Sequence, residues 1–161
     1  MKYLAALCPI LGLCLVLAGC ASMGRQPRLD NAAITPSTLQ PTESGVISVK
    51  VVDKYKIVNR VVGAVVEDPR MKFRLRDDGR PPDEKALDGI WSVQVEVPKL
   101  APPGNFTIEL TAYDSKGNAI VVKKARREKG PLTATTTMVI EYPPDAPAEE
   151  AAPAPTAQPP Q

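Results

Sequence analysis

The sequence predicts an all-β protein, an antiparallel β-sandwich of about seven strands. Short runs of the chain alternate apolar and polar residues, which is the period of a strand with one buried face. Turn-forming Gly, Pro, Asn and Asp residues separate these runs at the spacing that is typical of sandwiches. Aromatic residues make up only 4% of the 161 residues, while valine and threonine are plentiful. This composition favours a small core built from β-branched side chains.

Four strands are expected before residue 77. A short edge strand is predicted at 30–35, and the prolines that follow it break regular pairing. The run 45–53 alternates apolar and polar residues, and 71–76 does the same. The run 57–66 is apolar on nearly all positions of both faces, which favours a central place in a sheet.

Four further strands are expected at 91–97, 106–113, 119–124 and 133–142. The segment 114–118, Asp-Ser-Lys-Gly-Asn, is a hairpin signal because Asp and Gly accept the backbone angles of tight turns. The hairpin makes 119–124 the return strand of 106–113. A basic loop is predicted between this return strand and the last strand.

The composition excludes several classes of function. The chain has no histidine, so it cannot contain a Ser-His-Asp or Cys-His pair. Its formal net charge is only +2, which gives no indication of nucleic-acid binding. The three cysteines, Cys8, Cys14 and Cys20, fall in the first twenty residues, so the body of the protein has no disulfide.

The N-terminus is a predicted export signal and membrane anchor. A short basic start and the apolar run 4–17 form a signal peptide over 1–19, too short to be a membrane span. The run 17–20, Leu-Ala-Gly-Cys, resembles the lipobox of bacterial lipoproteins. The resemblance implies cleavage before Cys20, acylation of its sulfur and new amine (palmitate included), and, with Ala21 in place of aspartate, delivery to the outer membrane. The alternative is an ordinary signal peptide with a chance cysteine.

The mature chain is expected to have three parts. Residues 20–29 form a lipidated tether, 30–142 form the sandwich, and 143–161 form a disordered tail rich in Pro and Ala. The tail is either inert or a spacer or docking segment near peptidoglycan. Several acyl chains on Cys20 give stable anchoring where a single chain is marginal.

A long acidic loop is predicted between strands 71–76 and 91–97. It contains Asp-Asp-Gly at 77–79, a further acid at Asp83, and Ala-Leu-Asp-Gly-Ile-Trp-Ser at 86–92. This pattern resembles a loop of bacterial Ig-like or fibronectin-III-like domains, although Arg-Pro-Pro at 80–82 departs from it, as does Trp91 where tyrosine is usual. The resemblance covers about 34–142. It implies an Ig-like sandwich that serves as a spacer, adhesion or binding module without catalysis.

The acidic loop has two competing interpretations. In the structural one, Asp78 and Asp88 accept backbone hydrogen bonds in Asx turns, Gly79 and Gly89 supply positive φ, and Trp91 fills the core. In the functional one, carboxylates of the loop converge on a calcium ion, which prefers six to eight oxygen ligands. The candidate ligands are Asp77, Asp78, Asp83 and Asp88, with Glu84 nearby.

The function expected from the sequence is a lipid-anchored envelope protein with a non-catalytic structural or interaction module. Its partners would be the membrane and an envelope protein or glycan. The first alternative is a calcium-dependent binding module, and a hydrolase that uses two carboxylates is a remote one. The basic run, Lys123, Lys124, Arg126, Arg127 and Lys129, is either a solvated loop or a contact with anionic headgroups.

Overall fold

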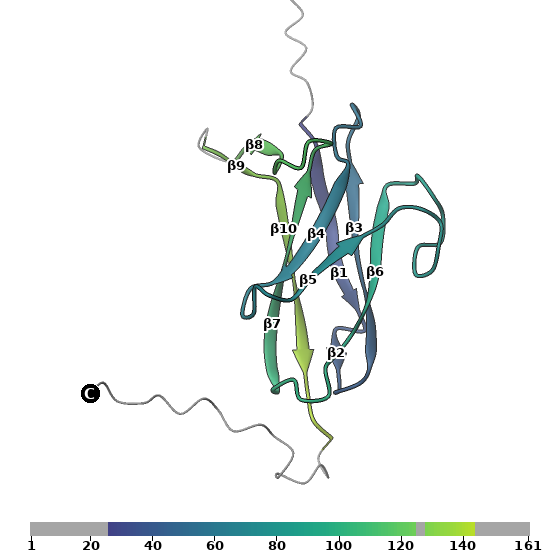
Figure 1. Ribbon diagram of the computed structural model, residues 1–161, viewed down its shortest axis with the longest axis vertical. Helices are drawn as coiled ribbons and strands as arrows, with labels where there is room; N and C mark the ends of the chain where they lie inside the picture. The colour runs from purple at the N-terminus through teal and green to yellow at the C-terminus, as the bar shows by residue number, and fades with distance from the viewer. Residues whose placement is uncertain (1–25, 125–127, 144–161) are drawn as a thin grey trace, which may run out of the picture.

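Two β-sheets pack face to face in the computed structural model, which describes residues 26–124 and 128–143 (Figure 1). The first sheet has the order β1-β3-β6 and contains β1 (Arg28–Thr35), β3 (Ser44–Val52) and β6 (Ile90–Glu96). The second sheet has the order β2-β10-β7-β4-β5 and contains β2 (Thr38–Leu39), β10 (Thr133–Ile140), β7 (Gly104–Tyr113), β4 (Arg60–Val65) and β5 (Lys72–Leu75). The predicted all-β, Ig-like sandwich of about seven strands is confirmed, with the two-residue β2 as an addition.

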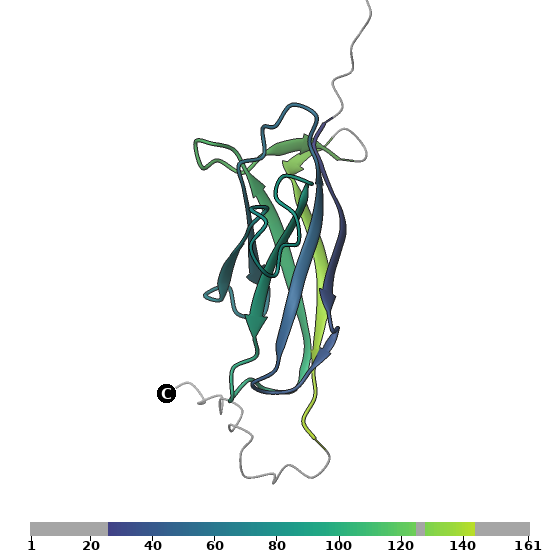
Figure 2. The same cartoon turned by 90° about the vertical axis from the view of Figure 1, so that its right-hand side faces the viewer.

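The strands of both sheets run along the long axis of the molecule, and all pairs but one are antiparallel. The exception is β2, which pairs parallel with the end of β10. The strand β1 begins at one end of the sandwich, where Arg28 is opposite Val52, and β10 finishes at the other end, where Ile140 is opposite Gly104 (Figure 2). The chain therefore enters the sandwich at one end and leaves it at the other.

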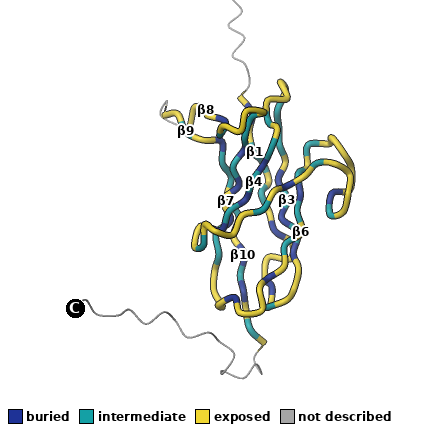
Figure 3. The backbone as a smooth tube through the Cα atoms, in the orientation of Figure 1, coloured by how far each residue is buried: buried dark blue, intermediate teal, exposed yellow. Residues whose placement is uncertain are grey.

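The core lies between the sheets, and the alternation seen in the sequence determines which side chains enter it (Figure 3). In β4 the burial pattern alternates strictly, and in β3 Gly45, Ile47 and Val49 point inward. Trp91, which was expected to fill the core, packs against it but is only half-buried. The largest fully buried side chains are Leu39, Ile47, Leu75, Ile108, Leu110, Val49 and Val61.

The predicted hairpin at 114–118 forms, but its return strand pairs elsewhere. The Asp114 and Asn118 backbones close the turn, and a single bridge joins Tyr113 to Ala119. Beyond it, β8 (Val121–Lys123) pairs with β9 (Lys129–Pro131) in a separate two-stranded sheet. The physical reason is that both edges of β7 are already occupied, one by β4 and the other by β10. The strand β9 also replaces part of the predicted basic loop.

Several sequence predictions fall outside the described residues. They include the signal peptide over 1–19, the lipidation of Cys20 and the tail from 144 onward. Of the predicted tether, 26–29 is described, and β1 begins at Arg28, two residues before the strand expected at 30–35. Within 26–124 and 128–143, the structure contains no helix that is long and apolar enough to cross a membrane.

Candidate functional site

The acidic loop connects β5 to β6 and projects from the side of the sandwich, facing the viewer in Figure 2. Its two ends meet at a bridge between Arg76 and Ser92, whose backbone hydrogen bonds are 2.9 and 2.8 Å long. The Asp77 carboxylate accepts a hydrogen bond from the Gly89 N–H at 3.1 Å and thereby closes the neck of the loop. The loop is thus held at its base by strand pairing and by one acidic side chain.

The Asx turns that the sequence predicts are present in the loop. Asp78 accepts a hydrogen bond from the Arg80 N–H at 3.1 Å, and Asp88 accepts one from the Ile90 N–H at 2.8 Å. Gly79 has a φ of 72°, which is accessible to glycine at little cost. These contacts support the structural interpretation for part of the loop.

Asp83 stabilises the loop from the inside. It is buried, with only 5% of its surface exposed. Its carboxylate accepts a hydrogen bond from the Gly79 N–H at 2.6 Å and a longer one from the Lys85 N–H at 3.4 Å. Its own N–H donates to the Arg80 carbonyl at 2.8 Å. The sequence marked Asp83 only as one acid among several, because nothing local to it predicts its burial.

Three of the four predicted calcium ligands come together in the structure. One carboxylate oxygen from each of Asp77, Asp83 and Asp88 lies within 4.8 Å of the other two. Asp78 is not part of this group, and its carboxylate lies 3.9 Å from the Arg76 guanidinium. The prediction that all four acids converge on one point therefore holds for three of them.

The three carboxylates have no cationic partner. No ion pair joins them to a lysine or arginine in the part of the chain that the structure describes. At 4.8 Å, two unit negative charges repel each other by roughly 3 kcal/mol for an effective dielectric constant of about 20. Solvent lowers this repulsion for Asp77 and Asp88, which are less buried than Asp83. The loop therefore holds three carboxylates close together with no lysine or arginine paired to them in the described structure.

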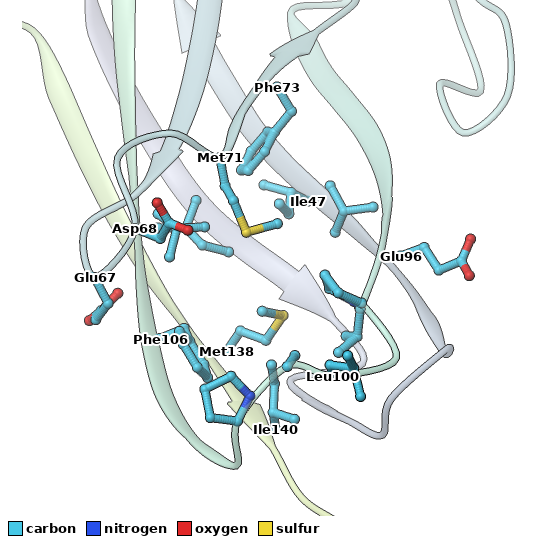
Figure 4. A pocket seen from close by; sticks show the side chains of 17 residues that line it. Ile47, Glu67, Asp68, Met71, Phe73, Glu96, Leu100, Phe106, Met138 and Ile140 are labelled. Atoms are coloured by element: carbon cyan, nitrogen blue, oxygen red, sulfur yellow. The ribbon is translucent and has the colours of Figure 1, made fainter. Parts of the chain in front are cut away.

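A second feature, a groove of about 630 Å³, opens between the sheets at the end where β10 finishes (Figure 4). Its floor is the hydrophobic core, and Met71 and Leu100 stand at its mouth with 42% and 60% of their surfaces exposed. The residues that line it and that Figure 4 labels are Ile47, Glu67, Asp68, Met71, Phe73, Glu96, Leu100, Phe106, Met138 and Ile140. The sequence did not predict the groove, although Leu100 is a large apolar residue in a proline-rich turn and Met71 begins a predicted strand.

The groove exists because β5 and β6 separate. They belong to different sheets and are joined only by the Arg76–Ser92 bridge within the described chain. The hydrogen bonds of a strand alternate between its two sides. Lys72 and Arg74 therefore direct their backbone groups toward β6, and Gln94 and Glu96 direct theirs toward β5. The structure records no backbone partner for them there among the residues it describes.

Two acidic side chains on one side of the groove have structural tasks. The Glu67 carboxylate accepts hydrogen bonds from the Thr107 N–H at 3.0 and 2.9 Å, and this interaction lowers the pKa of Glu67 below its ordinary value. The side chain of Arg70 donates to Asp68 at 2.8 and 3.0 Å and lowers the pKa of Asp68 in the same way. Both acids therefore stabilise the β4–β5 turn that forms one wall of the groove.

No family model matches this chain, and no curated protein matches its sequence.

Proposed function

We propose that this protein is a lipid-anchored, non-catalytic interaction module of the bacterial cell envelope, and that its groove binds an extended apolar segment of a partner protein. The anchor rests on the resemblance of 17–20 to a lipobox and on the apolar signal that precedes it. Delivery to the outer membrane follows from Ala21, as the same resemblance implies. The groove supplies the place where the partner binds.

One observation carries the proposal: β5 and β6 separate beyond the Arg76–Ser92 bridge, and the groove between them reaches apolar side chains of the core. An extended segment entering there can hydrogen-bond to the outward backbone groups of Gln94 and Glu96. Every second side chain of such a segment then points into the apolar groove. This mode of binding, in which a partner adds a strand to a free sheet edge, combines affinity from the backbone with specificity from the pockets.

A photo-crosslinking experiment tests the groove. A photoreactive amino acid is placed at Leu100 in the full-length protein, which remains in the envelope of cells that produce it. Val121 is the matched control, because it is 61% exposed against 60% for Leu100 and lies on β8, outside the groove. We expect one dominant crosslink at Leu100, to a peptide whose apolar residues alternate, and none at Val121.

A second variant tests the backbone part of the proposal. Proline at position 94 removes an N–H that faces away from β3, which an edge position tolerates. We expect Gln94→Pro to abolish the Leu100 crosslink, while Gln94→Thr retains it and both variants keep a melting temperature close to that of the parent. Equal crosslinking at Leu100 and Val121, or a crosslink that survives Gln94→Pro, contradicts binding at this edge.

The anchor is tested separately by Cys20→Ser. Without a thiol there is no acylation, so the processed protein should move from the membrane fraction to the soluble fraction after cell lysis. Retention of the processed variant in the membrane fraction contradicts the lipid anchor and leaves the groove experiment unaffected.

A further inference from the structure

We propose that the acidic loop is a calcium site in which Asp77, Asp83 and Asp88 are the protein ligands. This site lies on the connection from β5 to β6, whereas the groove lies between these strands and at the opposite end of β6. It is therefore independent of partner binding in the groove. The loop gathers several carboxylate oxygens, and some buried oxygen atoms there have no hydrogen-bond partner among the described residues.

Hydrogen bonds within the loop account for only part of the carboxylate oxygens. Asp77 uses Oδ2 to accept from Gly89, and Asp88 uses Oδ1 to accept from Ile90. The Asp77 Oδ1 atom is buried and has no hydrogen-bond partner in the described structure. A buried carboxylate oxygen without a partner is costly unless a cation or a donor compensates it.

Ser92 provides a second, independent observation. Only 4% of its surface is exposed, and its Oγ has no hydrogen-bond partner among the described residues. On β6 it alternates with Trp91 and Val93, which pack on the core, so its side chain points to the outer face of the sheet, under the loop. There it lines a hollow of about 280 Å³ together with Asp83 and Asp88. A buried hydroxyl thus lines the same hollow as two of the three clustered carboxylates, those of Asp83 and Asp88.

These donors fit calcium better than other common metals. All of them are oxygens, and carboxylate, hydroxyl and carbonyl oxygens are the ligands of hard cations. Zinc is disfavoured because the chain has no histidine and its only cysteines lie in the first twenty residues. Calcium also accepts irregular geometry and six to eight ligands, so water and backbone carbonyls complete its shell, whereas magnesium requires a near-ideal octahedron.

The expected affinity follows from the number of charges and from the location. Three carboxylates attract a cation strongly. The loop that carries them is held mainly by its own turns, however, so the site is less rigid than one built on strands. Extracellular calcium modules bind with dissociation constants of about 0.1–1 mM, and we expect the same range here. Binding only to the folded state raises the melting temperature in proportion to the logarithm of the calcium concentration above the dissociation constant.

The test uses the full-length lipidated protein in detergent, with CaCl2 as the probe. Calcium binding is measured by titration calorimetry, and the melting temperature is measured in excess chelator and in 10 mM CaCl2, with MgCl2 and NaCl of equal ionic strength as references. Asp77→Asn and Asp88→Asn remove a charge but keep an oxygen that can accept the same backbone hydrogen bond. Asp78→Asn is the matched control, because Asp78 is adjacent in sequence but outside the cluster.

We expect CaCl2, and not NaCl, to raise the melting temperature of the parent protein. Asp77→Asn and Asp88→Asn should weaken calcium binding at least tenfold, while Asp78→Asn should change it by less than twofold. In chelator, the two cluster variants should be as stable as the parent or more so, because they relieve repulsion between carboxylates. The proposal is overturned if calcium leaves the melting temperature unchanged, or if Asp78→Asn weakens binding as much as Asp77→Asn does.

Discussion

The contact between Gly63 and Phe73 shows how a single residue positions one wall of the groove. The two residues are cross-strand partners on β4 and β5. Gly63 is buried, and a Cβ atom added to it would overlap the Phe73 ring. The ring therefore lies over the glycine backbone, half-buried, with one side against the core and the other lining the groove.

Gly63→Ala should consequently destabilise the protein and disturb the groove. Overpacking of this kind typically costs about 1–3 kcal/mol of the free energy of unfolding, because the ring must leave its position. The measurement is a urea melt. In a background that carries Phe73→Leu, whose side chain is smaller, the same substitution should cost less. A cost that is equal in both backgrounds would show that the ring is not what Gly63 accommodates.

At the residue scale, the sequence identified the acidic residues of the loop but not which of their carboxylates lie close together. Asp78 and Asp88 each precede a glycine, and both form the expected Asx turns because those contacts are local. The grouping of Asp77 with Asp83 depends on how the whole loop folds over β6. The burial of Ser92 depends on the same fold, so neither feature has a local signal.

At the scale of elements, the β7 hairpin turn depends on one charged side chain. Asp114 accepts hydrogen bonds from the N–H groups of Lys116 and Asn118, both at 2.9 Å. The Asn118 N–H is the main cause that lowers the pKa of Asp114 below its ordinary value of 3.8. A lowered pKa in the folded state means that the charge contributes stability above the ordinary pKa. This contribution is lost as the pH falls through the lower, folded-state pKa.

Asp114→Asn should therefore lower the melting temperature at pH 7 and have little effect in strong acid. The neutral amide accepts the two N–H groups more weakly than the carboxylate does, but it matches the protonated acid. Melting temperatures of the parent and the variant, measured between pH 7 and pH 2.5, should converge below about pH 3.8. Ser115→Ala is the control, since its effect should not depend on pH. A constant difference between Asp114→Asn and the parent would contradict this assignment.

The strands were largely predictable from the sequence, and their pairing was not. Alternation of apolar and polar residues located both ends of β3, β6, β7 and β10 to within two residues. The last of these was predicted to extend to 142 and ends at Ile140. Pairing depends on which edges other strands already occupy. For this reason the predicted strand 119–124 does not pair along β7. Its part β8 pairs with β9 instead, so the Gly130-Pro131 segment belongs to a strand despite its turn-like composition.

At the scale of the whole molecule, the two ends of the sandwich differ in charge and surroundings. Where β1 begins, the Gln26 side chain accepts a hydrogen bond from the Lys123 N–H at 2.6 Å, which brings β8 and β9 to the start of the domain (Figure 1). The turn after β3, which contains Lys54 and Lys56, lies at this end too, because Arg28 pairs with Val52. The groove is at the other end, where Ile140 pairs with Gly104.

The end of the sandwich where β1 begins, with Lys54, Lys56 and Lys123, is here called the basic end. A lipid on Cys20 would hold this basic end against the membrane. The six peptide bonds between Cys20 and Gln26 span at most about 20 Å when the segment is fully extended. Lysines this close to an anionic surface each contribute about 1 kcal/mol of attraction. Exposed Tyr55 at this end supplies an apolar contact as well. In this orientation the groove would face away from the bilayer, where a partner can reach it.

The orientation predicts that residues 20–161 carrying Cys20→Ser, produced without the signal peptide, bind anionic vesicles weakly even without the lipid. Sedimentation with vesicles containing 30% phosphatidylglycerol should recover more protein than sedimentation with neutral phosphatidylcholine vesicles, and 0.5 M NaCl should remove the difference, because salt screens the attraction. Replacing Lys54 and Lys123 with glutamate should abolish the binding. Replacing Lys72 and Arg74 on β5 with glutamate changes the net charge equally but leaves the basic end intact, so binding should survive. If both double variants lose binding to the same extent, the net charge of the protein and not this end is responsible, and the orientation is wrong.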